Sequence, residues 1–507
     1  MFGVNEAKIL FEKYKDRPIL VYGDPDADGL FAMLLICQYL EMKGLTYSYY
    51  VNENRQHGFF LNPEKVKGYL VIAVDFDLIE ELDDVINSGA VVICFDHHDI
   101  CEEPVIRYKD DELVAVVVNN QYPFEPADNR YLSGAGVTYE SLCTITPEFK
   151  SKEREALVGI TLLSDICPIE NEKARRYLKT TYSADTTKGY AGYIVSSTSK
   201  VDFSFGVPKL DRSFIDYTFS PTVNSLLRFG YTESAVKFIL GKGLEVNCTR
   251  EKQSQLVQIM KQRAQFLEMR NFVAVALDEN AFTDMPEINL ANFIGLLASD
   301  IKGLGRSVLA FTYRDGAVTR ASFRGKYDGV LYRDAFVQLG LDAQGHPPAF
   351  GILNFKPYSE LWQIIDDTIA KLENGFSPSI QIVDVNNLSF FLMNKGYSIA
   401  TENCYVRDMF RTYIRYTGKG AKVIRTTYKT EPFTYEDQKS GLKHDKVIGG
   451  KKLKYVKDAN GNPIPKYIEY LIDGTMVKSF GISIEDGLIL PILERSAVQL
   501  YVKDKIN

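Results

Sequence analysis

The chain has 507 residues, of which 45% are hydrophobic and 25% charged, and its formal net charge is −7. This length predicts two to four globular domains. The acidic net charge excludes a uniformly basic coat for nucleic acid, and the sequence contains no run of 18 apolar residues that would predict a membrane span. The seven cysteines form no CxxC pair, and the first residues do not follow a signal-peptide pattern, so we expect reduced thiols in a cytoplasmic protein without a membrane partner.

Short apolar strands alternate with helices over roughly the first 190 residues, which predicts an α/β domain with a mostly parallel sheet. The expected strands are 18–22, 47–51, 69–74, 90–95 and 113–118, and the expected helices are 30–42 and 152–164. Asp24, Asp75 and Asp96 each follow one of these strands. Because ligands bind at the carboxyl ends of the strands in an open parallel sheet, we expect one cleft to gather these side chains.

The rest of the chain divides by composition into three further segments. The Gly375–Pro378 stretch is typical of a domain boundary, and the sequence beyond it is rich in β-forming and turn residues. We expect strands at 272–276 and 307–313 and helices at 290–301 and 358–372. The predicted domains are 1–190, a linker with a connecting helix at 191–247, a smaller α/β domain at 248–375, and a β-rich domain at 376–507.

Asp96-His97-His98 follows the apolar run 90–95 and is the strongest chemical signal in the sequence. A strand that ends in one carboxylate and two imidazoles places metal ligands at the rim of a sheet. Three other acidic sites are placed in the same way, directly after an apolar strand or helix: Asp24 with Asp26, Asp75, and Asp165.

Hydrolysis of a phosphodiester needs charge neutralisation at phosphorus and an ionised water at neutral pH, which two divalent ions supply together. Carboxylate oxygens suit Mg²⁺ and Mn²⁺, and an added imidazole favours Mn²⁺. In this hypothesis Asp24 and Asp26 face different ions, Asp75 bridges them, and His97 with Asp165 completes the second ion. The sequence therefore predicts a metal-dependent phosphoesterase.

Other interpretations of these acidic residues have weaker support than the metal site. The string Asp24–Gly29 also looks like part of a calcium loop, but the twelfth position of such a loop, which requires Glu, is Leu35. An isolated Asp75 would more often be a helix cap or turn residue. The ordered set of acids, each after an apolar run, favours the metal site.

With these motifs, the sequence resembles the DHH phosphoesterase superfamily, and most closely the RecJ-like single-strand exonucleases, over residues 18–352. Gly23–Gly29, Asp75, Asp96–His98 and Asp165 are similar to the four metal-site motifs of the family. The resemblance implies two Mn²⁺ or Mg²⁺ ions held by these acids and His97. It further implies that His98 lies near the scissile phosphate. We expect Asp28 and Asp96 to orient the metal ligands without binding the ions themselves.

More specific strings resemble the RecJ-like branch. They are 54–59, 132–137, 221–228, 321–324 and 344–351. The resemblance implies that the substrate backbone and its terminal phosphate are held by residues within these strings: Arg55, Asn224, Arg228, Arg324, Gly345 and His346.

The sequence departs from the family pattern at several positions. Asp77 stands where a glycine is usual, Gln344 replaces the first glycine of the histidine motif, and Gly325 follows Arg324 in place of serine. Ser225-Leu226-Leu227 replaces a run of small residues. These changes leave the metal set complete and concern substrate fit and cleavage direction.

The C-terminal segment carries the basic charge of the chain: residues 407–470 contain 15 lysines and arginines against 7 aspartates and glutamates. Aromatic side chains alternate with these cations, as in the basic grooves of OB-folds that bind single strands. We expect an OB-like domain, while a solvated lysine-rich surface is the alternative.

Together these features predict a two-metal exonuclease that degrades single-stranded DNA and releases mononucleotides, with 5′ to 3′ direction implied by the resemblance. A single-strand-binding protein or a helicase is an expected partner in DNA repair or recombination. The alternatives are a DHH phosphodiesterase for short oligonucleotides or cyclic dinucleotides, and an inactive scaffold associated with replication.

Overall fold

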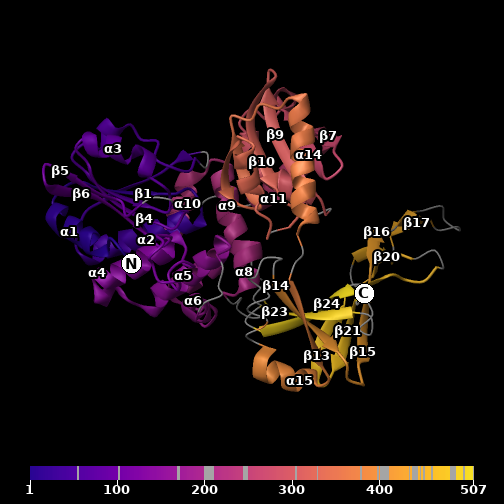
Figure 1. Ribbon diagram of the computed structural model, residues 1–507. Coiled ribbons are helices and arrows are strands. Elements are labelled where there is room, and N and C mark those ends of the chain that lie inside the picture. The colour runs from indigo at the N-terminus through magenta and orange to yellow at the C-terminus, as the bar shows by residue number, and fades with distance from the viewer. Residues whose placement is uncertain are drawn as a thin grey trace. The chain divides into compact units, whose positions relative to one another are not determined.

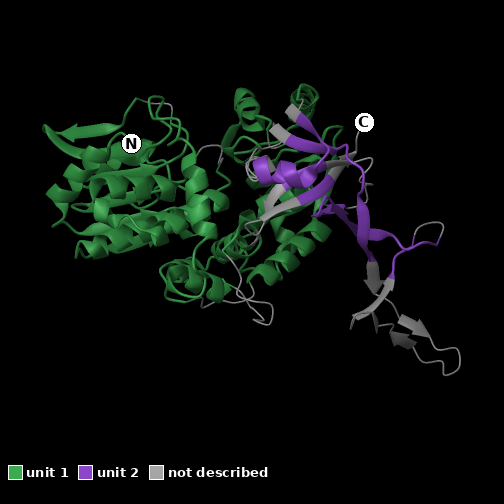
Figure 2. Cartoon of the chain, turned by 90° about the horizontal axis from the view of Figure 1, so that it is seen from below, with its two compact units in different colours: residues 1–377 green, residues 378–507 purple. Residues whose placement is uncertain are grey.

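The computed structural model describes most of the chain as two compact units, residues 1–377 and 378–507 (Figure 2). The residues outside the description are 54–55, 101–102, 168–171, 199–209, 244–248, 303–304, 328, 377–378, 397–398, 400–409, 433, 437–442, 446, 449–450, 458–460, 480–486, 495–496 and 506–507. Each unit is described separately below. The finer domain limits expected within the first unit stay a prediction.

The first sheet has the order β2-β1-β3-β4-β6-β5 and is parallel except for β5, which confirms the expected α/β architecture (Figure 1). Its strands are β1 (Ile19–Gly23), β2 (Ser48–Val51), β3 (Leu70–Val74), β4 (Val91–Asp96), β5 (Ile106–Lys109) and β6 (Glu112–Asn119). The sequence did not predict β5, which pairs antiparallel with β6 at one edge. The central strands β1, β3 and β4 are buried at every position, as parallel strands covered on both faces require.

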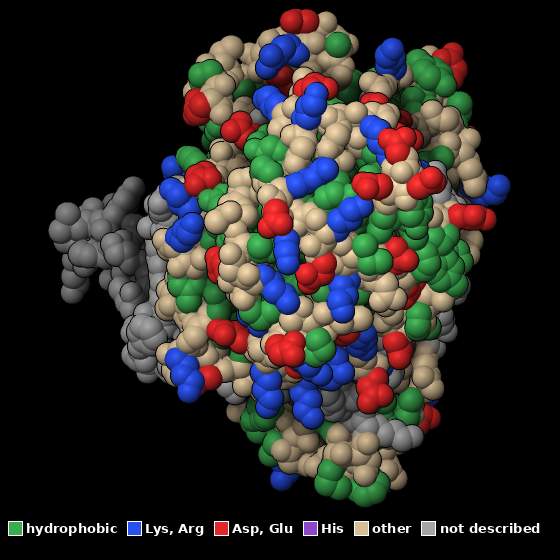
Figure 3. All heavy atoms as spheres, turned by 90° about the vertical axis from the view of Figure 1, so that its left-hand side faces the viewer, with side chains coloured by type: hydrophobic (Ala, Val, Ile, Leu, Met, Phe, Trp, Pro, Cys, Tyr) green, Lys and Arg blue, Asp and Glu red, His purple; other side chains and the backbone are tan. Residues whose placement is uncertain are grey.

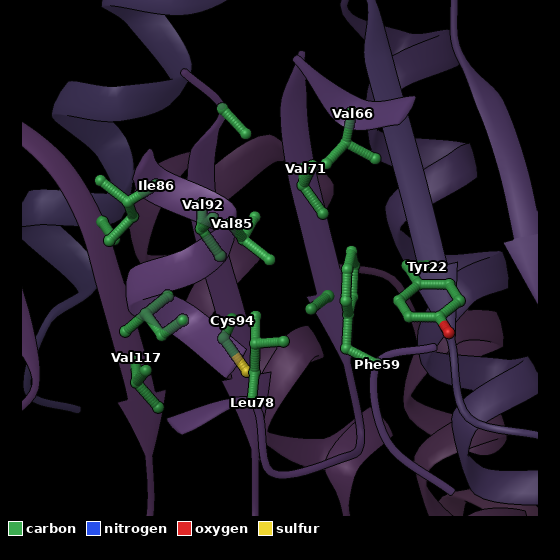
Figure 4. Packing of buried hydrophobic residues seen from close by; sticks show 14 of the residues in the cluster. Tyr22, Phe59, Val66, Val71, Leu78, Val85, Ile86, Val92, Cys94 and Val117 are labelled. Carbon is green, nitrogen blue, oxygen red and sulfur yellow. The ribbon is translucent and has the colours of Figure 1, made fainter. Parts of the chain in front are cut away.

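Helices cover both faces of this sheet (Figure 1). One face packs against α3 (Ile79–Asn87), and the other contacts α1 (Val4–Tyr14), α2 (Ala27–Met42) and α4 (Gly134–Ile145). Figure 4 shows the core on the α3 side, where alternate residues of the strands, including Tyr22, Val71, Val92 and Val117, pack against Val85 and Ile86. This packing fixes the strand ends that carry the acidic residues.

A group of helices follows and connects the two sheets of the first unit. The helix expected at 152–164 is present as α5 (Lys152–Ser164), capped by Ser151, whose Oγ accepts a hydrogen bond from N of Arg154. The other helices of this group are α6 (Glu172–Tyr182), α7 (Gly189–Thr198), α8 (Arg212–Phe214), a π-helical turn at Ile215–Phe219, α9 (Ser220–Arg228), α10 (Thr232–Ile239) and α11 (Thr249–Arg263).

The second sheet has the order β11-β12-β10-β9-β8-β7, and only the β8–β9 pair is parallel. Its strands are β7 (Gln265–Glu268), β8 (Phe272–Asp278), β9 (Ser307–Arg314), β10 (Ala317–Arg324), β11 (Asp342–His346) and β12 (Ala349–Leu353). The helices that follow these strands or lie between them are α12 (Ile294–Lys302), α13 (Tyr332–Gln338) and α14 (Ser359–Asn374). Short 3₁₀ turns lie at Glu279–Phe282 and Leu290–Phe293 in this part of the chain, and at Pro63–Val66 and Pro147–Phe149 in the part that contains the first sheet. The helix expected at 290–301 therefore begins as a 3₁₀ turn, capped by Asn289, before it continues as α12.

The second unit is β-rich, as its composition predicts, and centres on a mixed seven-stranded sheet. In sheet order its strands are β13 (Ser379–Val385), β14 (Phe410–Tyr416), β23 (Gly487–Glu494), β24 (Ala497–Lys505), β22 (Thr475–Ser479), β21 (Pro465–Ile472) and β15 (Lys422–Tyr428). The remaining elements are β16 (Thr430–Pro432), β17 (Thr434–Glu436), β18 (Lys443–Asp445), β19 (Val447–Ile448), β20 (Lys451–Tyr455), α15 (Leu388–Phe391) and a π-helical turn at Leu392–Gly396. The OB-like interpretation stays a prediction.

Charge on the surface is mixed where it can be seen. Figure 3 shows one face of the molecule, on which acidic and basic side chains are interspersed and gather into no patch of one sign. Among the described residues, no helix combines the length and the apolar character needed to cross a bilayer.

Candidate metal centre

The acidic residues meet where the strand order of the first sheet changes direction. Strand β1 lies between β2 and β3, so the chain leaves the carboxyl ends of β1 and β3 toward opposite faces. Backbone N of Asp24 donates to O of Val74 at 3.3 Å, and N of Asp75 donates to O of Phe95 at 2.8 Å. These bonds continue the sheet register by one residue and place Asp24, Asp75 and Asp96 side by side.

The loop after β1 turns sharply into α2. Oδ1 of Asp26 caps the helix by accepting a hydrogen bond from N of Gly29 at 3.0 Å. A Cβ at position 29 would lie 2.6 Å from Cβ of Asp24, so only glycine fits at this position. The carboxylate of Asp28 accepts hydrogen bonds from N of Gly134 at 2.6 Å and N of Ala135 at 3.1 Å, at the start of α4. Asp28 is therefore held by the protein and orients the loop.

Asp75 lies in a confined position against the same helix. Its φ of 68° is left-handed, a conformation that aspartate tolerates better than most residues. A Cβ at Gly134 would lie 2.2 Å from Oδ1 of Asp75. Because glycine leaves this space open, α4 approaches the carboxylate closely and the side chain of Asp75 stays only 2% exposed.

His97 lies at the centre of the acidic cluster. Its Nε2 is 3.2 Å from Oδ1 of Asp75, 3.6 Å from Oδ2 of Asp165 and 3.9 Å from Oδ2 of Asp28. Asp165 reaches this point from the end of α5, where it caps the helix. The structure thus brings together the residues that the sequence predicts as ligands of the second ion.

His98 and Asp96 form a separate pair beside His97. Nδ1 of His98 lies 2.8 Å from Oδ1 of Asp96, and Nδ2 of Asn119 donates to Oδ2 of Asp96 at 3.2 Å and to O of His98 at 3.0 Å. Burial opposes charge on both groups, but their mutual attraction outweighs it. The pKa of Asp96 is lowered, and the attraction of Asp96, with smaller contributions from Asp24 and Asp165, raises the pKa of His98 to about 10. His98 is consequently a cation at neutral pH, and its ring is half exposed.

The other carboxylates have the opposite electrostatics. Burial raises the pKa of Asp24, Asp28 and Asp75, and the neighbouring carboxylates raise it further; the pKa of Asp28 reaches about 6. His97 opposes this shift at Asp28, and His57 opposes it at Asp24. The cluster thus holds more negative charge than the nearby protein cations neutralise, which is the condition that a bound cation relieves.

The donor set fits divalent cations. Two groups of ligand atoms, Asp24 with Asp26 and Asp75, and Asp75 with His97 and His98, each lie within 4.8 Å of one another and share Asp75. Oδ1 of Asp24 and Oδ1 of Asp75 are buried and have no hydrogen-bond partner among the described residues. Unsatisfied buried carboxylate oxygens are costly, and hard ions such as Mg²⁺ and Mn²⁺ satisfy such oxygens.

Three residues of the site were not predicted as members. Nδ1 of His57 lies 2.7 Å from Oδ2 of Asp24, Asn119 supports the Asp96–His98 pair, and Sγ of Cys167 lies 3.3 Å from Oδ2 of Asp165. Sequence patterns carried only a weak signal for these residues, which is that His57 is one of only five histidines in the chain. The loop positions of His57 and Cys167 have no periodicity that predicts their direction.

The second sheet brings one predicted substrate residue to the cluster. Nε2 of His346, at the end of β11, lies 4.0 Å from Oδ1 of Asp165. His346 pairs with Ala349, which pairs with Arg324 on β10, so the imidazole and the guanidinium belong to one row across three strands. The Arg324 guanidinium donates to Oγ of Ser322 and O of Phe323 on its own strand and to Oγ of Ser299 on α12.

The turn that carries His346 is tied to the DHH motif by one arginine. The Arg333 guanidinium donates to O of Gly345 at 2.7 Å and to Oδ2 of Asp99 at 3.4 Å, and backbone N of Arg333 donates to O of Pro347 at 3.0 Å. Gly345 has a φ of 125°, a conformation that glycine adopts readily.

The remaining predicted substrate residues lie on α9 or outside the description. Asn224 and Arg228 are one turn apart and partly exposed on α9, and Nη1 of Arg228 donates to Oε1 of Gln253 at 3.4 Å. Ser220, at the start of this helix, shares a hydrogen bond of 2.8 Å with Ser164 beside Asp165. Arg55 lies outside the described residues.

The first sheet and its acidic centre define the class of domain. Residues 18–163 match the family model described as the DHH family, N-terminal domain.

Among individual proteins, the chain is 21% identical over 475 residues to the single-stranded-DNA-specific exonuclease RecJ of Bacillus subtilis. The match covers 85% of this chain and 57% of that protein, so the chain spans little more than half of its curated relative.

Solved structures show that the fold is RecJ-like. The crystal structure of RecJ from Thermus thermophilus in complex with Mn²⁺ matches with a TM-score of 0.65 at 16% identity, over 100% of this chain and 72% of that chain. The Mg²⁺ complex from the same organism matches with a TM-score of 0.58 at 14% identity, over 100% and 70%. An exonuclease RecJ bound to manganese matches with a TM-score of 0.51 at 18% identity, over 74% and 95%.

Proposed function

We propose that this protein is a two-metal exonuclease that hydrolyses single-stranded DNA in the 5′ to 3′ direction and releases mononucleotides. The observation that carries the proposal is the acidic cluster in which Asp75 is grouped with Asp24 and Asp26 and also lies against His97, which contacts Asp165, while the cationic His98 pairs with Asp96. That arrangement supports hydrolysis of a phosphodiester, because it combines sites for two cations with a fixed donor to oxygen. The distant likeness to RecJ supports the choice of single-stranded DNA.

The metal ligands in this proposal are the residues that the sequence singled out. Asp24, Asp26 and Asp75 would hold one ion, because the structure groups these three, so Asp24 and Asp26 share an ion instead of facing different ones as the sequence suggested. Asp75, His97 and Asp165 would hold the other ion. Bound there, Mn²⁺ or Mg²⁺ neutralises the charge of the phosphate and makes a water acidic enough to ionise at neutral pH.

The chain's own residues position the substrate and hold a proton. Asp96 engages Nδ1 of His98, so the imidazolium is oriented to donate from Nε2 to a phosphate oxygen. Asn119 fixes this pair, because it contacts both Asp96 and the backbone of His98. His346 and Arg324, from the second sheet, would bind the terminal phosphate and the backbone of the strand.

The remaining assignments depend on the same proposal. Arg55, Asn224, Arg228 and Gly345 would line the path of the strand, and the β-rich second unit would bind single-stranded nucleic acid. A single-strand-binding protein or a helicase would be the partner in repair or recombination, in the cytoplasm.

The test uses the full chain with Mn²⁺ and long single-stranded DNA labelled at either end, beside a labelled dinucleotide. Immediate release of labelled mononucleotide from the 5′-labelled strand, with the 3′ label lost last, supports the proposal. Cleavage of the dinucleotide alone contradicts it and identifies a small-substrate phosphodiesterase. Failure of Mn²⁺ to bind, measured by calorimetry, would instead indicate an inactive scaffold.

A further inference from the structure

One side chain of the centre does not suit the hard ions of the proposed reaction. The structure groups Sγ of Cys167 with ligand atoms of His97 and Asp165, all within 4.8 Å of one another. The thiol lies 3.3 Å from Oδ2 of Asp165 and is 7% exposed. Imidazole, carboxylate and thiolate together are the ligand types of zinc sites, whereas Mg²⁺ and Mn²⁺ prefer oxygen.

The local backbone directs this thiol into the centre. Ile166, between Asp165 and Cys167, has a φ of 55°, a left-handed conformation that a β-branched residue rarely adopts. Its side chain points outward and is 74% exposed, while Cys167 is buried. Backbone N of Cys167 donates to O of Leu162 at 2.9 Å, which fixes the turn against the end of α5. A strained turn of this kind persists where the surrounding structure determines it.

A second observation points to a cation at the same place. Oδ1 of Asp75 is buried, is aimed at His97 with a distance of 3.2 Å to its Nε2, and forms no hydrogen bond with any described residue. The carboxyl group is 2% exposed, so water does not replace the missing partner freely. His97 therefore links the two observations, because it lies beside this unsatisfied oxygen and shares a ligand group with Cys167 and the carboxylate of Asp165.

We propose that His97, Asp165 and Cys167 form a mixed nitrogen, oxygen and sulfur site that binds a thiophilic divalent ion of the zinc class. The proposal rests on the proposed function only in that it concerns the same centre, and it adds a second class of metal to it. On binding, the sulfur donates a lone pair to the ion and the thiol proton is released to solvent. Zn²⁺ at this position would compete with the second Mn²⁺ ion, since His97 and Asp165 are shared.

The chain contains a matched control for this thiol. Cys143 is a free, partly exposed cysteine on α4, and it belongs to none of the described groups of potential metal ligands. Cys143→Ser therefore removes one thiol without altering the centre. Cys167→Ser and Cys167→Ala remove the proposed ligand, and having both guards against a failure of one variant to fold.

The experiment is a Co²⁺ titration of the full chain, monitored by absorption in the near-ultraviolet. Co²⁺ replaces Zn²⁺ and gives a charge-transfer band when a thiolate is a ligand. We expect a band that saturates at one ion per chain, is retained in Cys143→Ser and is lost in both variants of Cys167. The absence of a band from the unaltered protein, or its survival without Cys167, would overturn the proposal.

Competition binding gives a second readout that is independent of catalysis. We expect Cys167→Ser to weaken Zn²⁺ binding by at least about tenfold and to leave Mn²⁺ binding within about twofold, because hard ions gain little from sulfur. Equal losses for both metals would contradict the proposal, since they would indicate a general disturbance of the centre. A thiolate band in a protein that cleaves no DNA would overturn the proposed function alone, and DNA cleavage without the band would overturn this proposal alone.

Discussion

The two sheets of the first unit each have six strands, but they place their charged residues in opposite ways. The first sheet is parallel apart from one edge strand, and its carboxylates are buried at the strand ends, with Asp24 3% and Asp75 2% exposed. The second sheet is mostly antiparallel, and His346 is about half exposed on its edge strand. Buried charge must be compensated within the molecule, whereas exposed charge remains available to a ligand.

This difference separates the expected roles of the two sheets. Changes at the first sheet should alter metal binding and the rate of the chemical step. Changes at the second sheet should alter the affinity for substrate and leave metal binding intact. The following predictions test that separation, from the largest expected effect to the smallest.

Asp75→Ala should remove cleavage almost completely, by at least about a thousandfold, because the shared ligand of both groups supplies several kcal/mol of charge stabilisation. Binding of single-stranded DNA should change little, since Asp75 is not exposed to a strand. Turnover of labelled DNA and a separate filter-binding assay measure the two effects. Asp83→Ala is the control, because Asp83 is an exposed carboxylate of α3 that lies 3.3 Å from Nε of Arg107 on the edge strand β5. Retained turnover in Asp75→Ala would refute the shared metal site.

His57→Ala should weaken Mn²⁺ binding by about 10- to 100-fold, the usual cost of losing a residue that orients a ligand. The reason is the 2.7 Å contact between Nδ1 of His57 and Oδ2 of Asp24, which leaves the other oxygen for the metal. Electron paramagnetic resonance of free Mn²⁺ measures the affinity. His57→Gln, which retains an N–H donor, should recover part of it; equal losses in both variants would argue against an orienting role.

His346→Ala should raise the KM for single-stranded DNA by about tenfold, as expected for the loss of one charge-assisted hydrogen bond to phosphate. The Mn²⁺ affinity should stay within about twofold of the unaltered protein, because the histidine is 4.0 Å from Asp165 and half exposed. Steady-state kinetics and Mn²⁺ titration on the same preparation measure both. A loss of Mn²⁺ binding would break the separation between the two sheets.

The stabilisation of the protein by Mn²⁺ should increase with pH. The pKa of Asp28 is about 6 in the folded metal-free protein against 3.8 for an ordinary aspartate. Between these values the unfolded chain has lost a proton that the folded protein retains, so the free energy of unfolding of the metal-free protein falls as the pH rises through about 6. Bound cations favour the ionised carboxylates and so remove this loss of stability at higher pH. Thermal melts with Mn²⁺ and with EDTA at pH 5 and pH 7.5 should differ more at the higher pH, and an equal difference at both would contradict the prediction.

Asp99→Asn should have the smallest effect, a change in KM of less than about fivefold. Its contact with Arg333 links the two sheets, but Asp99 is 75% exposed, and exposed ion pairs contribute about 0–1 kcal/mol. Kinetics at low and high salt measure the effect, which should disappear as salt screens the pair. A large, salt-independent loss would show that this contact determines the position of the His346 turn.

The same contrast explains how far the sequence could predict the structure. The central strands β1, β3 and β4 of the first sheet are buried on both faces, so their apolar runs and the acids that end them were recognisable. Helix α5 begins and ends where the pattern indicated. Strand β5 was missed because its residues, Ile106–Lys109, contain no apolar run. A two-residue turn then leads from β5 into β6. His57 and Cys167 were missed as members of the centre because they lie in irregular loops, where the direction of a side chain depends on contacts distant in sequence.

The hydrogen bonds to Asp28 bear on how the protein would bind the proposed metal ions. Two backbone N–H groups at the start of α4 donate hydrogen bonds to this carboxylate, and these bonds anchor the loop after β1 without any cation. We therefore expect folding to precede metal binding, in contrast to small zinc domains, which are unfolded without their ion. Exhaustive dialysis against a chelator should yield a folded, inactive protein that recovers activity within the time of mixing with Mn²⁺. Ion availability, rather than refolding, would set how fast such an enzyme is switched on.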